Sequence, residues 1–79
     1  MKKTRLIHLL KQLRLDAGLT QIELGEILGQ TQSYVSKYES GEQRLDLMEI
    51  EAICLAVGTP LIEFVERYLE SRPSFPKSK

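Results

Sequence analysis

Two glycines, Gly25 and Gly29, divide the most patterned stretch of this chain, residues 20–41, and constrain its fold more than any other feature. Leu24 and Leu28 recur one helical turn apart around the first glycine, which is the spacing of an apolar helix face. Gly25 carries no Cβ, so a second helix can cross the first at close range, and Gly29 can adopt the positive φ that ends a helix. The stretch is therefore predicted to form two short helices joined by a tight turn.

Capping residues mark where each of the two helices begins. Thr20 is followed three residues later by Glu23, a capping-box pair in which each side chain satisfies a backbone amide of the other residue. Thr31 can cap the second helix alone. Val35 and Tyr38 then turn one side of this second helix toward the protein interior. Two capped helices around one glycine turn are typical of a helix-turn-helix.

Four polar side chains remain on the outer face of the second helix, namely Gln32, Ser33, Ser36 and Lys37. Gln can pair with both groups on an adenine edge, Lys can reach guanine acceptors or a phosphate, and Ser can donate to either. The amino terminus of the helix also favours a phosphate. The alternative is a solvated face of an ordinary bundle helix, which normally carries more Glu and Lys pairs. We therefore predict that this helix reads double-stranded DNA.

The stretch from Leu10 to Val57 resembles the Cro/C1-type helix-turn-helix family of phage and bacterial transcriptional regulators, also called XRE-like or lambda-repressor-like. The similarity rests on the runs LRLDAGLTQIELGEILG, QSYVSKYESG and EQRLDLMEI. It implies an all-α fold, a compact five-helix lambda-repressor-like bundle. Gln30 departs from the family pattern, because many members have an aliphatic residue directly after the turn glycine. This departure weakens the expected packing at that position but not the turn.

The resemblance also implies roles for individual residues. Gln21 would contact the phosphate backbone, the outer-face residues would enter the major groove, and Arg14 and Glu39 would form a structural pair that orients the recognition helix. Arg44, in the connection that follows, is either a phosphate clamp or a solvated loop arginine. The full set of predicted DNA-binding residues is Gln21, Thr31, Gln32, Ser33, Tyr34, Ser36, Lys37 and Arg44.

Three further helices complete the predicted bundle. The first runs from about residue 4 to 16, where apolar residues recur at helical spacing until a glycine ends it. Another begins after Asp46, which forms a second capping-box-like pair with Glu49, and the last begins at Pro60 and runs to about residue 70. Residues 1–70 are predicted to form a single domain and residues 71–79 a disordered basic tail.

The last helix carries more apolar side chains than a small bundle normally covers. We expect part of this surface to face a second subunit, through Phe64, Val65, Tyr68 and Leu69. The alternative is that all of these side chains cap the core of a single subunit. A symmetric dimer would place two recognition helices roughly 34 Å apart and require an inverted-repeat operator.

The titratable residues argue against an enzyme or a cofactor-dependent protein. One histidine and one cysteine cannot supply a metal cluster, and His8 and Cys54 fall on separate helices, the first at a surface or half-buried position and the second in the core. The amino-terminal run is too short and too polar for a signal peptide, and no stretch could span a membrane. A cytoplasmic protein is expected, in a bacterial or phage setting, bound to the nucleoid when on DNA.

Charge is distributed unevenly along a chain whose formal net charge is zero. Residues 1–44 sum to +2, residues 45–70 to −5 and residues 71–79 to +3. The small positive charge of residues 1–44 predicts few phosphate contacts per subunit and a shallow salt dependence of DNA binding, so discrimination between DNA sequences must come from base edges and DNA shape.

The sequence as a whole predicts a homodimeric repressor that binds a palindromic operator. The alternatives are a protein-interaction module, such as an antitoxin that neutralises a partner through the last helix or the tail, and RNA binding, which ranks last.

Overall fold

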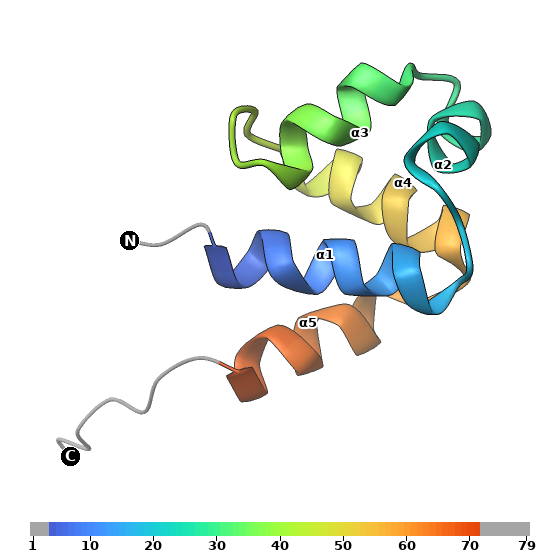
Figure 1. Ribbon diagram of the computed structural model, residues 1–79. Coiled ribbons are helices and arrows are strands. Elements are labelled where there is room, and N and C mark those ends of the chain that lie inside the picture. Colours follow the sequence, from blue (N-terminus) through green and yellow to red (C-terminus); the bar gives the residue numbers. More distant parts are fainter. Residues whose placement is uncertain (1–3, 72–79) are drawn as a thin grey trace, which may run out of the picture.

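Five helices and no strand make up residues 4–71, the part of the chain that the computed structural model describes (Figure 1). They are α1 (Thr4–Asp16), α2 (Gln21–Leu28), α3 (Gln32–Glu39), α4 (Leu47–Val57) and α5 (Leu61–Ser71). The predicted all-α, five-helix fold is confirmed. α1 packs against α3, α4 and α5, and in Figure 1 α3 and α5 lie on opposite sides of it. The tail predicted over residues 71–79 lies outside the described residues, apart from Ser71 at the end of α5.

The turn between α2 and α3 has the close approach predicted at Gly25. A Cβ at this position would lie 2.9 Å from the carbonyl oxygen of Thr31 and 3.0 Å from its carbonyl carbon. Gly29 ends α2 in the left-handed region, with φ at 69°. The amide of Gln30 donates to the carbonyl of Gly25 at 2.8 Å, so the polar residue after the glycine leaves the turn intact.

The predicted caps fix where three of the helices begin. At the start of α2, Thr20 Oγ1 accepts from the amide of Glu23 at 3.0 Å, and Glu23 Oε1 accepts from the amide of Thr20 at 2.9 Å. Asp46 and Glu49 form the same reciprocal pair before α4, with both hydrogen bonds at 2.8 Å. Thr31 Oγ1 caps α3 by accepting from the amide three residues further on. Each cap satisfies amides that have no partner within the helix.

A single apolar core lies between the helices and receives at least one side chain from each. Its buried members are Leu10, Leu13, Leu24, Val35, Tyr38, Ile50, Ile53, Cys54 and Phe64. Cys54 occupies the predicted inward face of α4, and burial raises the pKa of its thiol. His8 is exposed on α1. The core therefore joins α3 to α1 and α4, and this packing sets the direction in which the outer face of α3 points.

Phe64 corrects the prediction for the last helix. Its side chain is only 3% exposed, because α5 packs against both α1 and α4 and Phe64 lies on the side that meets them. The assignment of Phe64 to a dimer interface is therefore wrong. Tyr68 is half-buried, and the guanidinium of Arg5 lies 4.1 Å from the centre of its ring. Val65 packs at the margin of the core, which leaves Leu69, at 44% exposure, as the exposed member of the predicted set.

Replacing Tyr38 by phenylalanine is expected to raise the free energy of unfolding by about 1 kcal/mol, because its buried hydroxyl finds no hydrogen-bond partner among residues 4–71. Burial is also the main cause that raises the pKa of Tyr38. The unfolded chain then ionises this phenol first, so stability should fall as pH rises above about 10. Urea unfolding at several pH values checks both effects. The phenylalanine variant should lose part of the alkaline decline, and a variant less stable than the parent at neutral pH would contradict the prediction.

Candidate nucleic-acid interface

One face of α3 points away from the core and carries polar side chains. Val35 and Tyr38 are fully buried, which fixes the inward side of the helix. Gln32, Ser33 and Lys37 are exposed and Ser36 is half-buried on the other side. Thr31, at the amino-terminal cap, is also exposed. A helix that stands out from the bundle with hydrogen-bonding groups of this kind can enter a DNA major groove.

A buried ion pair holds the carboxyl-terminal end of α3 against α1. Arg14 Nε donates to Glu39 Oε2 at 2.7 Å and Arg14 Nη2 donates to Glu39 Oε1 at 3.0 Å, a two-point contact between side chains that are 8% and 4% exposed. Arg14 Nη1 also donates to the carbonyl of Leu19 at 2.8 Å. The hydrogen bond to Glu39 is the largest cause that raises the pKa of Arg14. The pair thus ties α1, the α1–α2 connection and α3 together.

Two glutamines extend this ion pair to the surface. Gln21 Nε2 donates to Glu39 Oε1 at 3.0 Å, and Gln32 Nε2 donates to Gln21 Oε1 at 2.9 Å. A continuous chain of hydrogen bonds therefore runs from Arg14 through Glu39 and Gln21 to Gln32. Its buried end lies within the bundle, and its exposed end is the first residue of α3.

A search of solved structures found proteins with the same arrangement of helices. An XRE-family like protein from Pseudomonas syringae pv. tomato str. DC3000 is 38% identical, with a TM-score of 0.82 over 89% of this chain and 85% of that one. The clp gene regulator ClgR from Corynebacterium glutamicum is 25% identical, with a TM-score of 0.76 over 87% and 88% of the two chains. The restriction-modification controller protein C.Esp1396I is 22% identical, with a TM-score of 0.79 over 85% and 88%, and this likeness concerns the fold.

A helix-turn-helix family profile matches residues 10–64, which cover α2, the turn and α3 and extend into α5. The chain belongs to the Cro/C1-type helix-turn-helix family. This Cro/C1-type chain is therefore a DNA-binding protein of the transcriptional-regulator class.

A search of curated protein sequences gave no significant match. None of the helices within residues 4–71 is long and apolar enough to cross a membrane, and no group of three metal-ligating side chains occurs among these residues.

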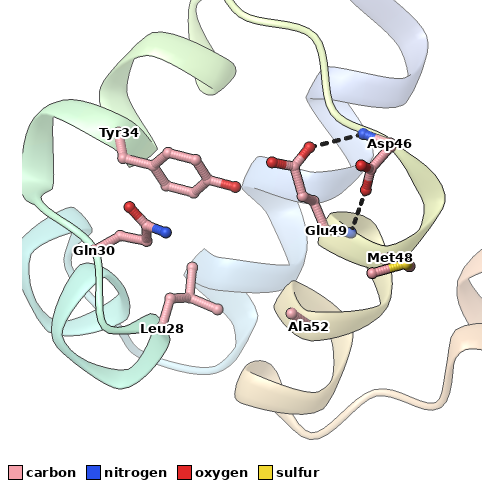
Figure 2. Close-up of a pocket in the computed structure, with 7 residues that line it drawn as sticks. All are labelled: Leu28, Gln30, Tyr34, Asp46, Met48, Glu49 and Ala52. Carbon is pink, nitrogen blue, oxygen red and sulfur yellow. Dashed lines mark hydrogen bonds between the residues drawn. The ribbon is translucent and has the colours of Figure 1, made fainter.

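Tyr34, another predicted DNA-binding residue of this Cro/C1-type domain, is half-buried and lines a groove between α3 and the start of α4. Figure 2 shows its ring extending from α3 toward Glu49 at the start of α4. The groove that it helps to line is formed by Leu28, Gln30, Tyr34, Asp46, Met48, Glu49 and Ala52. Burial is the largest cause that raises the pKa of Tyr34, followed by the charges of Glu49 and Asp46. A phosphate would meet two carboxylates beside this hydroxyl, so Tyr34 is a weaker candidate for a backbone contact than Gln21.

Arg44 is exposed in the connection between α3 and α4, and its guanidinium forms no ion pair within the part of the chain that the structure describes. Its charge is therefore available to a phosphate.

Nothing in the sequence indicates that Gln21 bonds to both Glu39 and Gln32, because these residues are 18 and 11 positions away along the chain. Only the packing of α2 across α3 brings the three side chains together.

Proposed function

We propose that this protein is a sequence-specific regulator of transcription that binds an inverted-repeat operator as a homodimer and acts as a repressor. The observation that supports the proposal most directly is the exposed polar face of α3, whose direction is set by a buried ion pair and by the core. A dimer that occupies a promoter would block polymerase sterically. Residues 4–71 would then recognise the operator and hold the protein in place on it, and would carry out no chemical reaction on the DNA.

The residues of the candidate interface have different tasks in the proposed complex. Gln32 would pair with an adenine edge, and Lys37 would reach guanine acceptors or a phosphate. Ser33 and Ser36 would donate to neighbouring base edges or to backbone oxygens. Thr31, Gln21 and Arg44 flank α3 and would fix its depth in the groove through phosphate contacts.

Replacing Gln32 or Lys37 by alanine is expected to weaken operator binding by about tenfold or more, since each would lose a direct contact to a base or phosphate. The operator is first obtained by selecting bound sequences from a random duplex pool, and affinity is then measured by mobility shift. Gln12→Ala is the matched control, because Gln12 is an exposed glutamine on α1. Far-ultraviolet circular dichroism should be unchanged in all variants. Full retention of the operator by both α3 variants would overturn the recognition-helix assignment.

The proposed dimer contact follows an apolar stripe on α5. Ile62, Val65 and Leu69 recur at i, i+3 and i+7, which places them on one side of the helix. Ile62 is 66% and Leu69 44% exposed, although both are large apolar side chains. A chain of 79 residues buries little surface by itself, so pairing two such stripes would add a substantial part of its apolar burial.

Ile62→Asp is expected to convert the dimer to a monomer, because pairing would bury an unpaired carboxylate in an apolar contact. Ile22→Asp is the matched control: both positions are the second residue of a helix, and Ile22 is 58% exposed on α2. Sedimentation equilibrium should give a monomer mass for Ile62→Asp and a dimer mass for Ile22→Asp. A wild-type protein that is monomeric at high concentration would contradict the dimer and favour the alternative that α5 binds a different protein.

A further inference from the structure

We propose that the groove between α3 and the start of α4 holds residues 72–79 of a second copy of this chain, with Phe75 against its apolar side chains and Lys77 beside its two carboxylates. The contact needs a second copy but no DNA, so it goes beyond the proposed function. Residues 72–79 lie outside the part of the chain that the structure describes, and they enter here through their sequence, RPSFPKSK, alone.

The groove has an apolar lining that the bundle leaves open to solvent (Figure 2). Leu28, Tyr34, Met48 and Ala52 supply this lining, and Met48 is 76% exposed although it is a large apolar side chain. The volume of the groove is about 370 Å³, within the range of about 300–1,000 Å³ that is usual for binding sites. An apolar side chain that enters the groove would therefore remove apolar surface from water.

Two carboxylates, those of Asp46 and Glu49, lie on one side of the groove. Each uses one oxygen to cap α4, and neither forms an ion pair with any of the residues that the structure describes. Their charges reach the hydroxyl of Tyr34, because they add to burial in raising its pKa. No basic side chain lines the groove, so its occupant should bring positive charge as well as an apolar group.

Residues 72–79 have the composition that this groove requires. Arg72, Lys77 and Lys79 give the segment a charge of +3 without any acidic residue, whereas residues 45–70 sum to −5. Phe75 lies two positions before Lys77, so in an extended chain both side chains point to the same side. The two prolines of the segment favour an extended chain and reduce the entropy that docking costs. The segment therefore matches the groove in charge, in apolar content and in the spacing of the two groups.

The position of the groove assigns the segment to a second copy. In Figure 1, α3 and α5 lie on opposite sides of α1, and a helix with its side chains is about 10–12 Å wide. Phe75 is four residues beyond Ser71, where α5 ends, so it can lie at most about 14 Å from that end. This length does not carry Phe75 around α1 and into the groove of its own subunit. In a symmetric dimer the contact would form twice and add to the apolar burial of the proposed α5 pairing.

Paramagnetic broadening tests whether the segment of one copy reaches the groove of another. A nitroxide is attached to the thiol introduced by Ser78→Cys. Cys54 is fully buried and burial raises the pKa of its thiol, so it should stay unlabelled. Spin-labelled protein is mixed with isotope-enriched parent protein, so that only the copy without the spin label is observed by nuclear magnetic resonance. We expect the amide signals of Tyr34, Met48 and Ala52 in that copy to broaden.

Two variants should weaken docking for different reasons. Phe75→Ser in the spin-labelled copy leaves residues 4–71 unchanged and removes the apolar group, so the affinity should fall by about tenfold or more. Glu49→Gln in the observed copy keeps Oε1 as the acceptor that caps α4 but removes one charge, so the affinity should fall by up to about fivefold. Glu23→Gln is the matched control, because Glu23 has the same capping position on α2 and does not line the groove. It should leave the broadening unchanged.

Loss of the broadening with Phe75→Ser, together with its persistence in Glu23→Gln, would support docking of the segment. Broadening confined to α5 would leave the proposed dimer in place and overturn the docking. Equal broadening in the parent, Phe75→Ser and Glu49→Gln would also overturn it, because the segment would then lie near the groove without binding there. Broadening of the groove signals only when the nitroxide and the isotope are on the same copy would overturn the assignment to a second copy.

Discussion

Arg14→Ala is expected to lower the free energy of unfolding by about 3–5 kcal/mol, which is the range found when one partner of a buried ion pair is removed. The substitution leaves the carboxylate of Glu39 buried at 4% exposure without its cation, and it also removes the donor to the carbonyl of Leu19. Both losses fall where α1, the α1–α2 connection and α3 meet. The melting temperature should therefore fall markedly, and operator binding should weaken with it.

Arg67→Ala provides a control for this prediction within the same chain. Arg67 also pairs with a glutamate, Glu63, at 2.6 Å, but the two side chains are 43% and 45% exposed and lie four residues apart on α5. Pairs of this kind contribute about 0.3–0.5 kcal/mol. Thermal and urea unfolding of both variants should therefore give a large loss for Arg14→Ala and almost none for Arg67→Ala. Equal melting temperatures for Arg14→Ala and the parent protein would remove the structural role assigned to the buried pair.

Gly25→Leu is expected to destabilise the protein by about 3 kcal/mol, at the upper end of the usual cost of overpacking. The first side-chain carbon would already lie 2.9 Å from the backbone oxygen of Thr31, and a backbone cannot move aside as a flexible side chain can. α3 would have to shift relative to α2. Since the turn directs the outer face of α3, operator affinity should fall further than the loss of stability alone would cause.

Glu26→Leu separates crowding at the turn from the general effect of adding a leucine to α2. Glu26 is the next residue along the same helix and is exposed. Leucine is a good helix former, so neither substitution should weaken the helix through propensity. Urea unfolding and mobility shift should show a loss for Gly25→Leu and little change for Glu26→Leu. A Gly25→Leu variant as stable as the parent would show that the crossing of α2 and α3 does not depend on glycine.

The features that could be predicted from the sequence are those whose partners are close along the chain. Thr20 and Glu23 are three residues apart, and their capping box is present as predicted. Gly29 takes the left-handed conformation expected of a residue that ends a helix. Such features depend on local geometry and on a few side chains, so the order of residues specifies them almost completely.

Helix α5 shows where prediction from a pattern failed. Its apolar residues cover a wide arc, and nothing in their spacing says which of them meets α1 and α4. Phe64 was predicted to face a second subunit and is buried at 3% exposure, whereas Ile62 was left out of the predicted contact and is 66% exposed. The rotation of a helix about its own axis is set by the helices that pack against it, because the rotation that buries the largest apolar area is the most stable.

The candidate DNA-binding site shows the same difference between features with nearby partners and features with distant partners. The spacing of Val35 and Tyr38 was enough to predict the polar face of α3, because these two residues define the opposite, inward side of one short helix. That polar face consists of Gln32, Ser33, Ser36 and Lys37. The Arg14–Glu39 pair, 25 residues apart in sequence, was anticipated only through the family resemblance. The hydrogen bonds of Gln21 to Glu39 and Gln32 were not anticipated at all.

Order along the chain was enough to specify five helices, their caps and the glycine turn, because each of these depends on atoms a few residues apart. The rotation of α5 and the hydrogen bonds of Gln21 required the folded protein. The rotation depends on the area that α1 and α4 bury. The hydrogen bonds depend on packing that brings Glu39 Oε1 of α3 to within 3.0 Å of Gln21 Nε2 of α2. A hydrogen bond can hold an amide in one orientation only after folding has brought its partner within reach.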